Sequence, residues 1–224
     1  MAYFYVKSEI DNTPLAVQEF GNRNGRPLVF IHGFSQSYWC WKKQFHDPRL
    51  SKFRMVAFDL RGHGCSGKPL DEASYLDSRM WASDLRSIIR SLEIIKPVIV
   101  SWSYSGLIVC DYLRHNGDSE IAGINFVGAR TKVGTPEAKK MSGSLFLDLA
   151  AGFCSENSED RLTAVYEFLV NLTRCNIPYP DIYEMLGYNL SVPARICRVL
   201  LERVADNDTL ITKLKIPTLI THGD

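Results

Sequence analysis

Ser103 is the residue of this sequence whose setting best suits nucleophilic chemistry. It lies between a short apolar run at 98–100 and a second apolar segment at 107–113, with no residues left over for a loop. The run predicts a buried strand and the segment predicts a buried helix, so the chain must turn sharply at Ser103. Such a turn needs small side chains two positions away, where Ser101 and Ser105 stand. The pattern predicts a nucleophile elbow, in which the serine hydroxyl is exposed beside the first N–H groups of a helix. A serine cluster that only caps the helix is the alternative.

The elements that must hold Ser103 in place alternate along the chain. Apolar runs predict strands, and apolar residues at helical spacing predict helices. The predicted strands lie at 3–7, 15–19, 27–31, 53–58, 98–100, 121–127 and 216–221, and the predicted helices between them at 38–45, 75–92 and 107–113. Strands that alternate with helices predict an α/β fold, with a mostly parallel sheet covered by helices on both faces.

Residues 131–205 have a different pattern. They contain many apolar residues in helix-like stretches and no convincing strand. These stretches lie at 136–151, 159–175 and 179–203. Because one helix suffices for a crossover between parallel strands, we interpret 131–205 as a helical cap inserted into a core formed by 1–130 and 206–224. An ordinary run of crossover helices is the alternative.

The apolar side chains of this insertion need either a sheet edge or a pocket to cover. We expect them to close over Ser103 and Phe34. Phe146, Phe168 and Tyr183 are the candidates for lining a substrate pocket.

Composition excludes several classes of partner. The chain has 26 basic and 25 acidic residues, so nothing suggests nucleic acid or an anionic membrane surface. The first residues lack the basic start and apolar core of a signal peptide, and no apolar run is long enough to span a bilayer. The six cysteines are scattered without paired spacing, which favours buried thiols in a reducing compartment over disulfides or a metal site. We therefore expect a cytoplasmic protein without metal or membrane.

Four short motifs each lie at the end of a predicted strand. They are His-Gly-Phe at 32–34, Asp-x-Arg-Gly-x-Gly-x-Ser at 59–66, the serine turn at 103, and Pro-Thr-Leu-Ile-x-His-Gly-Asp at 217–224. With these motifs in this order, nearly the whole chain resembles the α/β-hydrolase family. The resemblance is strongest to compact members of the esterase, epoxide hydrolase and cofactor-free haloperoxidase type. It implies the α/β-hydrolase fold and no cofactor.

The resemblance also implies roles for particular residues. Ser103 would be the nucleophile, and the backbone N–H groups of Phe34 and Tyr104 would form the oxyanion hole. Loss of one such donor costs on the order of 3 kcal/mol. Asp59 and Arg61 would be structural rather than catalytic. A serine nucleophile favours a small-molecule ester, lactone or thioester substrate, whereas an aspartate would have suggested a dehalogenase or an epoxide hydrolase.

A serine nucleophile needs a histidine base that is oriented by an acid. In the family these follow the serine in the order acid, then histidine, and the acid usually stands three residues after the glycine that corresponds to Gly223. The histidines at 32, 46, 63, 115 and 222 all stand too early for the base. We therefore expect the sequence to be truncated before the acid, the histidine and the last strand and helix. The strand at 216–221 would then form a sheet edge, and this chain alone would not be a competent hydrolase.

Two other functions compete with the serine hydrolase. The serines at 101 and 105 stand where glycines are usual, which with the missing base and acid suggests a non-catalytic protein that binds a ligand or partner. The loop 62–67 also matches the dinucleotide fingerprint G-x-G-x-x-G, which would suggest an oxidoreductase. That fingerprint requires a helix that begins on the motif, whereas Lys68 and Pro69 follow here. The sequence predicts neither the substrate nor the oligomeric state.

Overall fold

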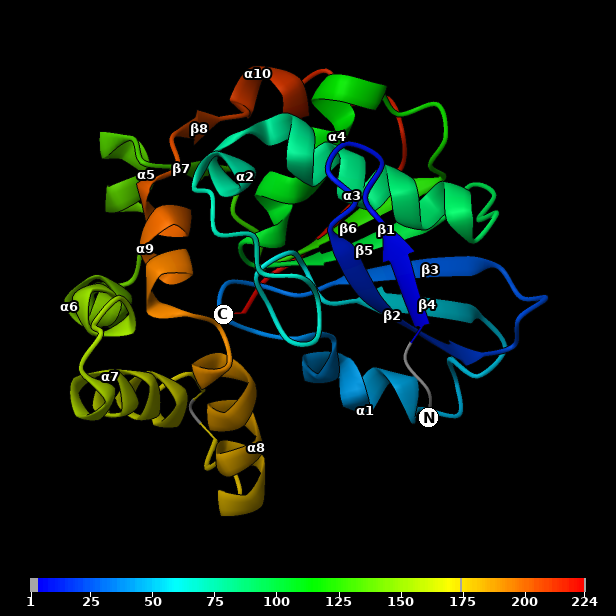
Figure 1. Cartoon of the computed structure of the whole chain (residues 1–224). Helices are drawn as coiled ribbons and strands as arrows, with labels where there is room; N and C mark the ends of the chain where they lie inside the picture. Colours follow the sequence, from blue (N-terminus) through cyan, green and yellow to red (C-terminus); the bar gives the residue numbers. More distant parts are fainter. Residues whose placement is uncertain (1–3, 174, 224) are drawn as a thin grey trace.

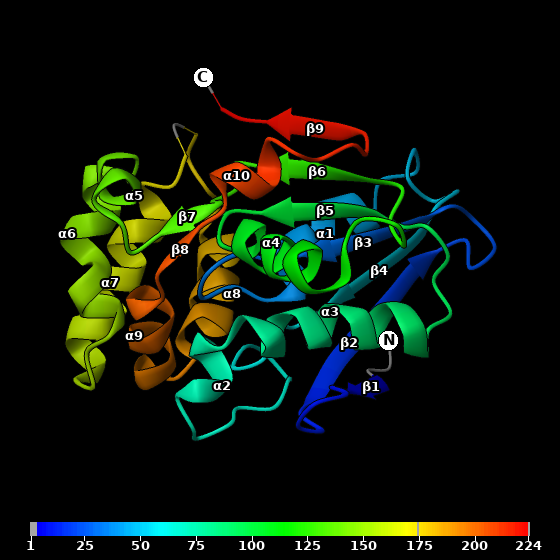
Figure 2. The ribbon, with the colours of Figure 1, turned by 90° about the horizontal axis from the view of Figure 1, so that it is seen from above.

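The computed structural model describes residues 4–173 and 175–223. A seven-stranded sheet crosses the molecule (Figure 1), and its strand order, seen from above in Figure 2, is β1-β2-β4-β3-β5-β6-β9. Its strands are β1 (Phe4–Lys7), β2 (Pro14–Gly21), β3 (Pro27–Ile31), β4 (Arg54–Phe58), β5 (Val98–Trp102), β6 (Gly123–Val127) and β9 (Thr218–Thr221). The strands from β4 to β9 in this order pair in parallel, while β1–β2 and β2–β4 pair antiparallel. The predicted α/β fold with a mostly parallel sheet is confirmed.

Helices cover both faces of this sheet because its inner strands are apolar on both sides. One face packs against α3 (Ser78–Ser91) and α4 (Ser105–Asn116), and the buried side chains of Val29 and Ile31 belong to this layer. The other face packs against the 3-10 helix η1 (Tyr38–Trp41) and α1 (Lys42–Phe45). There the ring of Phe30 lies 5.2 Å from Trp41 and 5.7 Å from Phe45, between centroids. Successive side chains of β3 therefore pack alternately into the helix layers on the two faces of the sheet.

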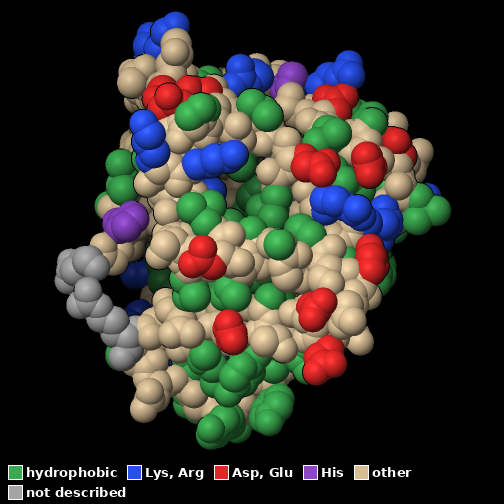
Figure 3. All heavy atoms as spheres, turned by 90° about the vertical axis from the view of Figure 1, so that its left-hand side faces the viewer, with side chains coloured by type: hydrophobic (Ala, Val, Ile, Leu, Met, Phe, Trp, Pro, Cys, Tyr) green, Lys and Arg blue, Asp and Glu red, His purple; other side chains and the backbone are tan. Residues whose placement is uncertain are grey.

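A group of helices lies beyond the carboxyl ends of the parallel strands (Figure 2). These helices are α5 (Pro136–Lys140), α6 (Ser144–Phe153), α7 (Ser158–Val170), α8 (Tyr179–Leu190) and α9 (Ala194–Glu202). Helices α6, α7 and α8 share a hydrophobic cluster that includes Phe153, Val165 and Leu169, whereas the buried side chains of α9, such as Ile196, belong to the main core. Figure 3 shows hydrophobic side chains over this end of the molecule, where Tyr179 and Leu162 are among the exposed ones. Two short helices elsewhere are α2 (Ala73–Leu76) and α10 (Asp208–Ile211).

Two predictions about this helical segment were wrong. The stretches 136–151 and 179–203 are each two helices, because Gly143 caps the start of α6 and Pro193 caps the start of α9. Pro193 has no N–H for a continuous helix and disfavours helical backbone in the residue before it. The segment also begins and ends in a two-stranded antiparallel sheet, β7 (Lys132–Val133) with β8 (Ala205–Asp206). Strands of two residues are too short to give a periodic signal.

The strand β9 forms one edge of the sheet, as predicted. It pairs with β6 on one side, and Leu219 and Ile220 are 59% and 74% exposed. Within the described residues, none of the helices has the length and apolar character needed to cross a membrane.

Candidate active site

The chain turns sharply at Ser103, as the sequence predicted, and the backbone of this turn is strained. Ser103 has a φ of 56°, in the left-handed region that residues other than glycine rarely adopt. Its backbone is held on both sides: Ser103 N donates to the carbonyl of Val127 (3.1 Å), and Arg130 N donates to the carbonyl of Ser103 (2.8 Å). These bonds tie the turn to the loop after β6. Strain of this kind persists where the surrounding structure fixes it, commonly at active sites.

The two serines in place of the usual glycines are accommodated by hydrogen bonds. The hydroxyls of Ser101 and Ser105 lie 3.0 Å apart, and both residues are fully buried. Ser105 Oγ also lies within hydrogen-bonding distance of the carbonyls of Ile31 (3.0 Å) and Trp102 (2.9 Å). The pair therefore links the end of β5, the start of α4 and the end of β3. The departure from glycine is thus compatible with the tight turn.

Gly33 brings the loop after β3 directly against the nucleophile candidate. A Cβ at this position would lie 3.0 Å from Ser103 Cβ and 3.4 Å from Ser103 Oγ. Only glycine permits this approach without displacing the turn. The peptide that joins Gly33 to Phe34 consequently lies next to the Ser103 hydroxyl.

The buried ring of His32 fixes the orientation of that peptide. Leu60 N donates to His32 Nε2 (3.0 Å), so the proton is on Nδ1, which donates to the carbonyl of Gly33 (2.9 Å). Burial lowers the pKa of His32 to about 4, which keeps the ring neutral at pH 7. In a trans peptide the N–H points away from the C=O. The N–H of Phe34 is therefore directed away from His32.

The two predicted oxyanion donors have no other acceptor in the described part of the chain. Neither Phe34 N nor Tyr104 N donates a hydrogen bond to a described residue. Tyr104 is the residue before α4, where the first helical N–H groups have no partner within the helix. Gly33 lies against Ser103, so the loop that carries Phe34 and the start of α4 meet at the same point.

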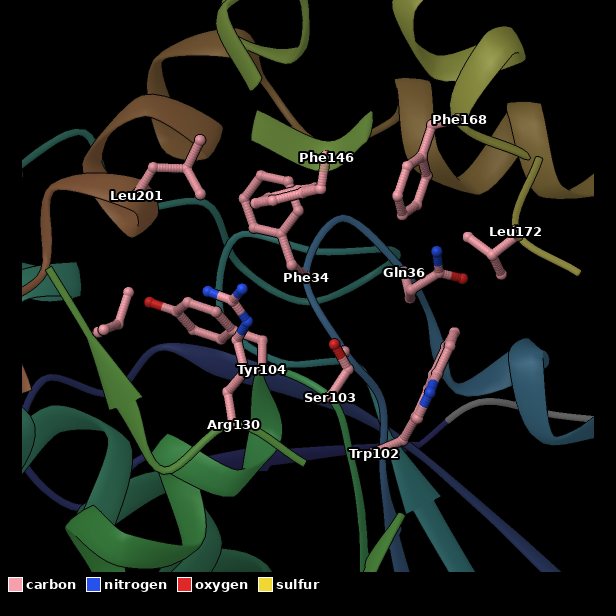
Figure 4. Close-up of a pocket in the computed structure, with 12 residues that line it drawn as sticks. Phe34, Gln36, Trp102, Ser103, Tyr104, Arg130, Phe146, Phe168, Leu172 and Leu201 are labelled. Atoms are coloured by element: carbon pink, nitrogen blue, oxygen red, sulfur yellow. The ribbon is translucent and has the colours of Figure 1, made fainter. Parts of the chain in front are cut away.

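A cavity of about 210 Å³ opens above Ser103 (Figure 4). It is lined by Gly33, Phe34, Gln36, Trp102, Ser103, Tyr104, Arg130, Val133, Phe146, Phe168, Leu172 and Leu201. The Ser103 hydroxyl points into it and has no hydrogen bond to any described residue. The ring of Phe146 lies 5.9 Å from those of Phe34 and Phe168, so aromatic side chains from the loop, α6 and α7 form one wall. A small apolar group fits such a site.

Tyr183 does not line this cavity, so its predicted position was wrong. It is 69% exposed, whereas Ile182 and Leu186 on the same helix are buried. Successive helical residues are about 100° apart, so the packing of α8 through Ile182 and Leu186 turns Tyr183 outward. The sequence alone did not indicate which face of α8 would be buried.

The cavity is also lined by residues that were not predicted from the sequence as site residues. Trp102 ends β5, and Arg130 comes soon after the end of β6. Because the carboxyl ends of adjacent parallel strands meet at one edge of a sheet, Arg130 could have been found from its position after a predicted strand. Leu172 follows α7 and Leu201 lies in α9, so the packing of these helices decides where the two side chains lie, and no sequence signal identified them.

No histidine among the described residues faces Ser103. His32 and His63 are buried and hydrogen-bonded to the carbonyls of Gly33 and Arg61. The remaining histidines, at 46, 115 and 222, bond to Lys42 O, Ser78 Oγ and Gly223 O. None of the residues that line the cavity is acidic. Within residues 4–173 and 175–223, no cluster of His, Cys, Asp or Glu could hold a metal ion.

The loop after β4 is closed by its own hydrogen bonds. The carboxylate of Asp59 accepts bonds from Tyr38 N (2.9 Å) and Cys65 N (2.8 Å), and a Cβ at Gly64 would lie 2.1 Å from it. Arg61 is fully buried and pairs with Asp84 at 2.6 Å. Neither Asp59 nor Arg61 lines the cavity. The carboxylate occupies the space that the N–H groups of a phosphate-binding loop would leave for an anion, which argues against a nucleotide site.

Known proteins similar to this chain are hydrolases and related enzymes. The family model described as "alpha/beta hydrolase fold" matches residues 26–176. "AB hydrolase superfamily protein YisY" of Bacillus subtilis (strain 168) is 30% identical over 114 residues, which are 50% of this chain and 40% of that protein. "Non-heme chloroperoxidase CPO-A1" of Kitasatospora aureofaciens is 26% identical over 223 residues, 96% of this chain and 78% of that protein. The solved structure of esterase RhEst1 from Rhodococcus sp. ECU1013 has a TM-score of 0.87 and 33% identity, and the match covers 100% of this chain and 81% of that chain.

Proposed function

Because the chain belongs to the α/β-hydrolase fold family, we propose that it is a serine hydrolase with Ser103 as its nucleophile. Its substrate is a small ester, a lactone or a related acyl compound. The observation that carries this proposal is the Ser103 turn itself. Acyl transfer is supported by a serine at φ 56° whose hydroxyl is free in a cavity lined by Phe34 and Tyr104, since the backbone N–H groups of both residues have no acceptor among the described residues.

The proposed reaction has two steps. Ser103 Oγ attacks the carbonyl carbon, its proton passes through the general base to the leaving alcohol oxygen, and an ester to Ser103 forms as the C–O bond breaks. Water then attacks that ester, and the acid is released as the proton returns to Oγ. In both steps the oxyanion accepts hydrogen bonds from Phe34 N and Tyr104 N. Because charge develops on this oxygen in the transition state, such donors lower the barrier more than they stabilise bound substrate.

In this proposal the general base and its acid lie outside the described residues. The described histidines are bonded elsewhere, and burial lowers the pKa of His32 to about 4 and that of His63 to about 3. Without a base the serine stays protonated, and only modest catalysis by the oxyanion hole and by binding is left. A chain of residues 1–224 should therefore bind esters without turning them over through Ser103. Ser103-dependent turnover by that chain would show that a base lies within it.

We further propose that 131–205 acts as the cap of the substrate site. Phe146 on α6 and Phe168 on α7 line the cavity together with Phe34. A cap that excludes water strengthens the electrostatic interactions inside the site. Phe146 and Phe168 are the proposed contacts for the apolar part of the substrate, and Tyr183 is no longer among them.

Kinetics of the natural protein test the proposal. Short-chain 4-nitrophenyl esters are the substrates, and Ser103→Ala is compared with Ser91→Ala, a matched change at an exposed serine at the end of α3. We expect Ser103→Ala to lose at least about 1,000-fold in kcat, because nucleophile and base act as a unit. Ser91→Ala should keep the native rate. Binding of esters without Ser103-dependent turnover would instead indicate a non-catalytic ligand-binding protein.

A further inference from the structure

The cavity above Ser103 has a single charged side chain among its described lining residues, that of Arg130. Arg130 is half-buried, and Figure 4 shows its side chain directed into the same space as the Ser103 hydroxyl. Its backbone N–H donates to the carbonyl of Ser103 at 2.8 Å, so the residue is anchored next to the nucleophile. The rest of the lining is apolar or aromatic apart from Gln36 and the hydroxyls of Ser103 and Tyr104. A positive charge is therefore built into an otherwise largely apolar site.

This guanidinium has no carboxylate partner in the described part of the chain. Nη2 donates to the Ser142 hydroxyl, and the group lies 5.7 Å from the centroid of the Phe146 ring. By contrast, the buried guanidinium groups of Arg61 and Arg203 each contact a carboxylate at 2.6 Å. A guanidinium has five N–H donors, so most of those of Arg130 are available to a ligand. Burial lowers the pKa of Arg130 from its ordinary value, but an arginine in a protein stays protonated.

We propose that Arg130 binds a carboxylate on the substrate, so that the preferred substrates are small esters or lactones with one negative charge. This inference rests on the proposed serine hydrolase function and narrows its substrate class. The planar fork of a guanidinium matches the two oxygens of a carboxylate. The unmatched charge of the cavity and its small volume, about 210 Å³, favour a short chain between the carboxylate and the scissile carbonyl. The aromatic wall of Phe34, Phe146 and Phe168 would contact that chain.

The test compares charged and neutral substrates of similar size on the natural protein. For the acyl side these are 4-nitrophenyl hydrogen glutarate and 4-nitrophenyl hexanoate. For the alcohol side they are 4-acetoxybutyrate and its methyl ester. In one of the two pairs, the native protein should have a higher kcat/KM for the charged substrate than for the neutral one. Arg130→Met should lower the ratio of these two kcat/KM values by about 10- to 100-fold, which is the effect expected for hydrogen bonds to a charged group. Arg130→Lys should restore part of the ratio. Arg23→Met, at an exposed arginine outside the cavity, should leave it unchanged.

Two outcomes would overturn the proposal. If Arg130 only supports Phe146, Arg130→Met will lower turnover of charged and neutral substrates alike, with no change in the ratio. If the protein turns over none of these esters, the proposed function has failed but the binding claim can still be measured. Calorimetry should then detect glutarate binding that is at least about 10-fold weaker in Arg130→Met, while the dimethyl ester binds both proteins equally. Equal glutarate binding by both would refute the role of Arg130.

Discussion

Lowering the pH from 8 to 5 should destabilise the fold through two buried histidines, His32 and His63. The Nε2 atom of His32 accepts a hydrogen bond from Leu60 N, so protonation would break that bond. His63 is fully buried, its Nδ1 bonds to the carbonyl of Arg61, and its Nε2 has no partner among the described residues. The two ring centroids are 5.0 Å apart. A charge on either ring would therefore lie in a buried site that already holds another imidazole.

The sign and size of the effect follow from the pKa values. Burial lowers the pKa of His32 to about 4, and burial together with the neighbouring His32 ring lowers that of His63 to about 3. The unfolded chain has a histidine pKa of about 6.5, so below pH 6.5 it binds more protons than the folded chain. The stabilisation is fully present above pH 6.5 and is lost as the pH falls toward the folded-state values. By linkage, each ring accounts for a loss of about 2 kcal/mol between pH 8 and pH 5.

Urea unfolding at a series of pH values and constant ionic strength measures this loss. The variant His63→Asn keeps a donor near the position of Nδ1 and cannot titrate. The substitution can lower the free energy of unfolding at pH 8 by any amount without affecting the test. Between pH 8 and pH 5, the free energy of unfolding of His63→Asn should fall by about 2 kcal/mol less than that of the native protein. His115→Asn, at an exposed histidine, is the matched control. Parallel profiles for the native protein and His63→Asn would refute the assignment.

Three further single substitutions test how the site is held. Asp111→Leu should cost about 3–5 kcal/mol, because it leaves the buried Arg203 guanidinium, now 2.6 Å from the carboxylate, without that partner. Adding Arg203→Met should recover most of the loss, and a double variant as unstable as the single one would contradict this. Gly106→Ala should destabilise the fold by about 1–3 kcal/mol, because the alanine Cβ would lie 2.3 Å from the backbone carbonyl oxygen of Arg130. This clash should outweigh the better helix propensity of alanine, and a gain in stability would contradict the expectation. Ser105→Ala should lower the unfolding free energy by about 1 kcal/mol by removing its hydrogen bonds to Ser101 and Ile31, and denaturation at the native midpoint would contradict that.

The local features of the site could be predicted from the sequence because short-range sterics determine them. An apolar strand, a helix with no intervening loop and small residues at 101 and 105 leave only a sharp turn at Ser103, and its φ of 56° agrees. The alternation of apolar strands and helices determines the parallel sheet. That sheet brings the loop of Phe34 and the start of α4 together, since β3 and β5 are neighbours. These conclusions needed no knowledge of side-chain packing.

Features that depend on packing between distant segments could not be predicted. The outward position of Tyr183 follows from which face of α8 meets α7, and both faces of that helix carry apolar residues. Arg130 was predictable in part, because it follows a predicted strand, and it enters the cavity because β6 pairs beside β5. Pro193 indicated that a helix would end there, but the apolar residues on both sides of it favoured the prediction of one helical stretch over 179–203.

Trapping the covalent intermediate tests most directly whether Ser103 is the nucleophile. The natural protein is incubated with a 4-nitrophenyl alkylphosphonate, which esterifies an activated serine and releases 4-nitrophenol, and is then digested for peptide mapping by mass spectrometry. We predict one phosphonylated site, on Ser103, lost in Ser103→Ala and kept in Ser91→Ala. Phosphonylation of another residue in the native protein, or equal labelling of Ser103→Ala, would contradict the proposed mechanism.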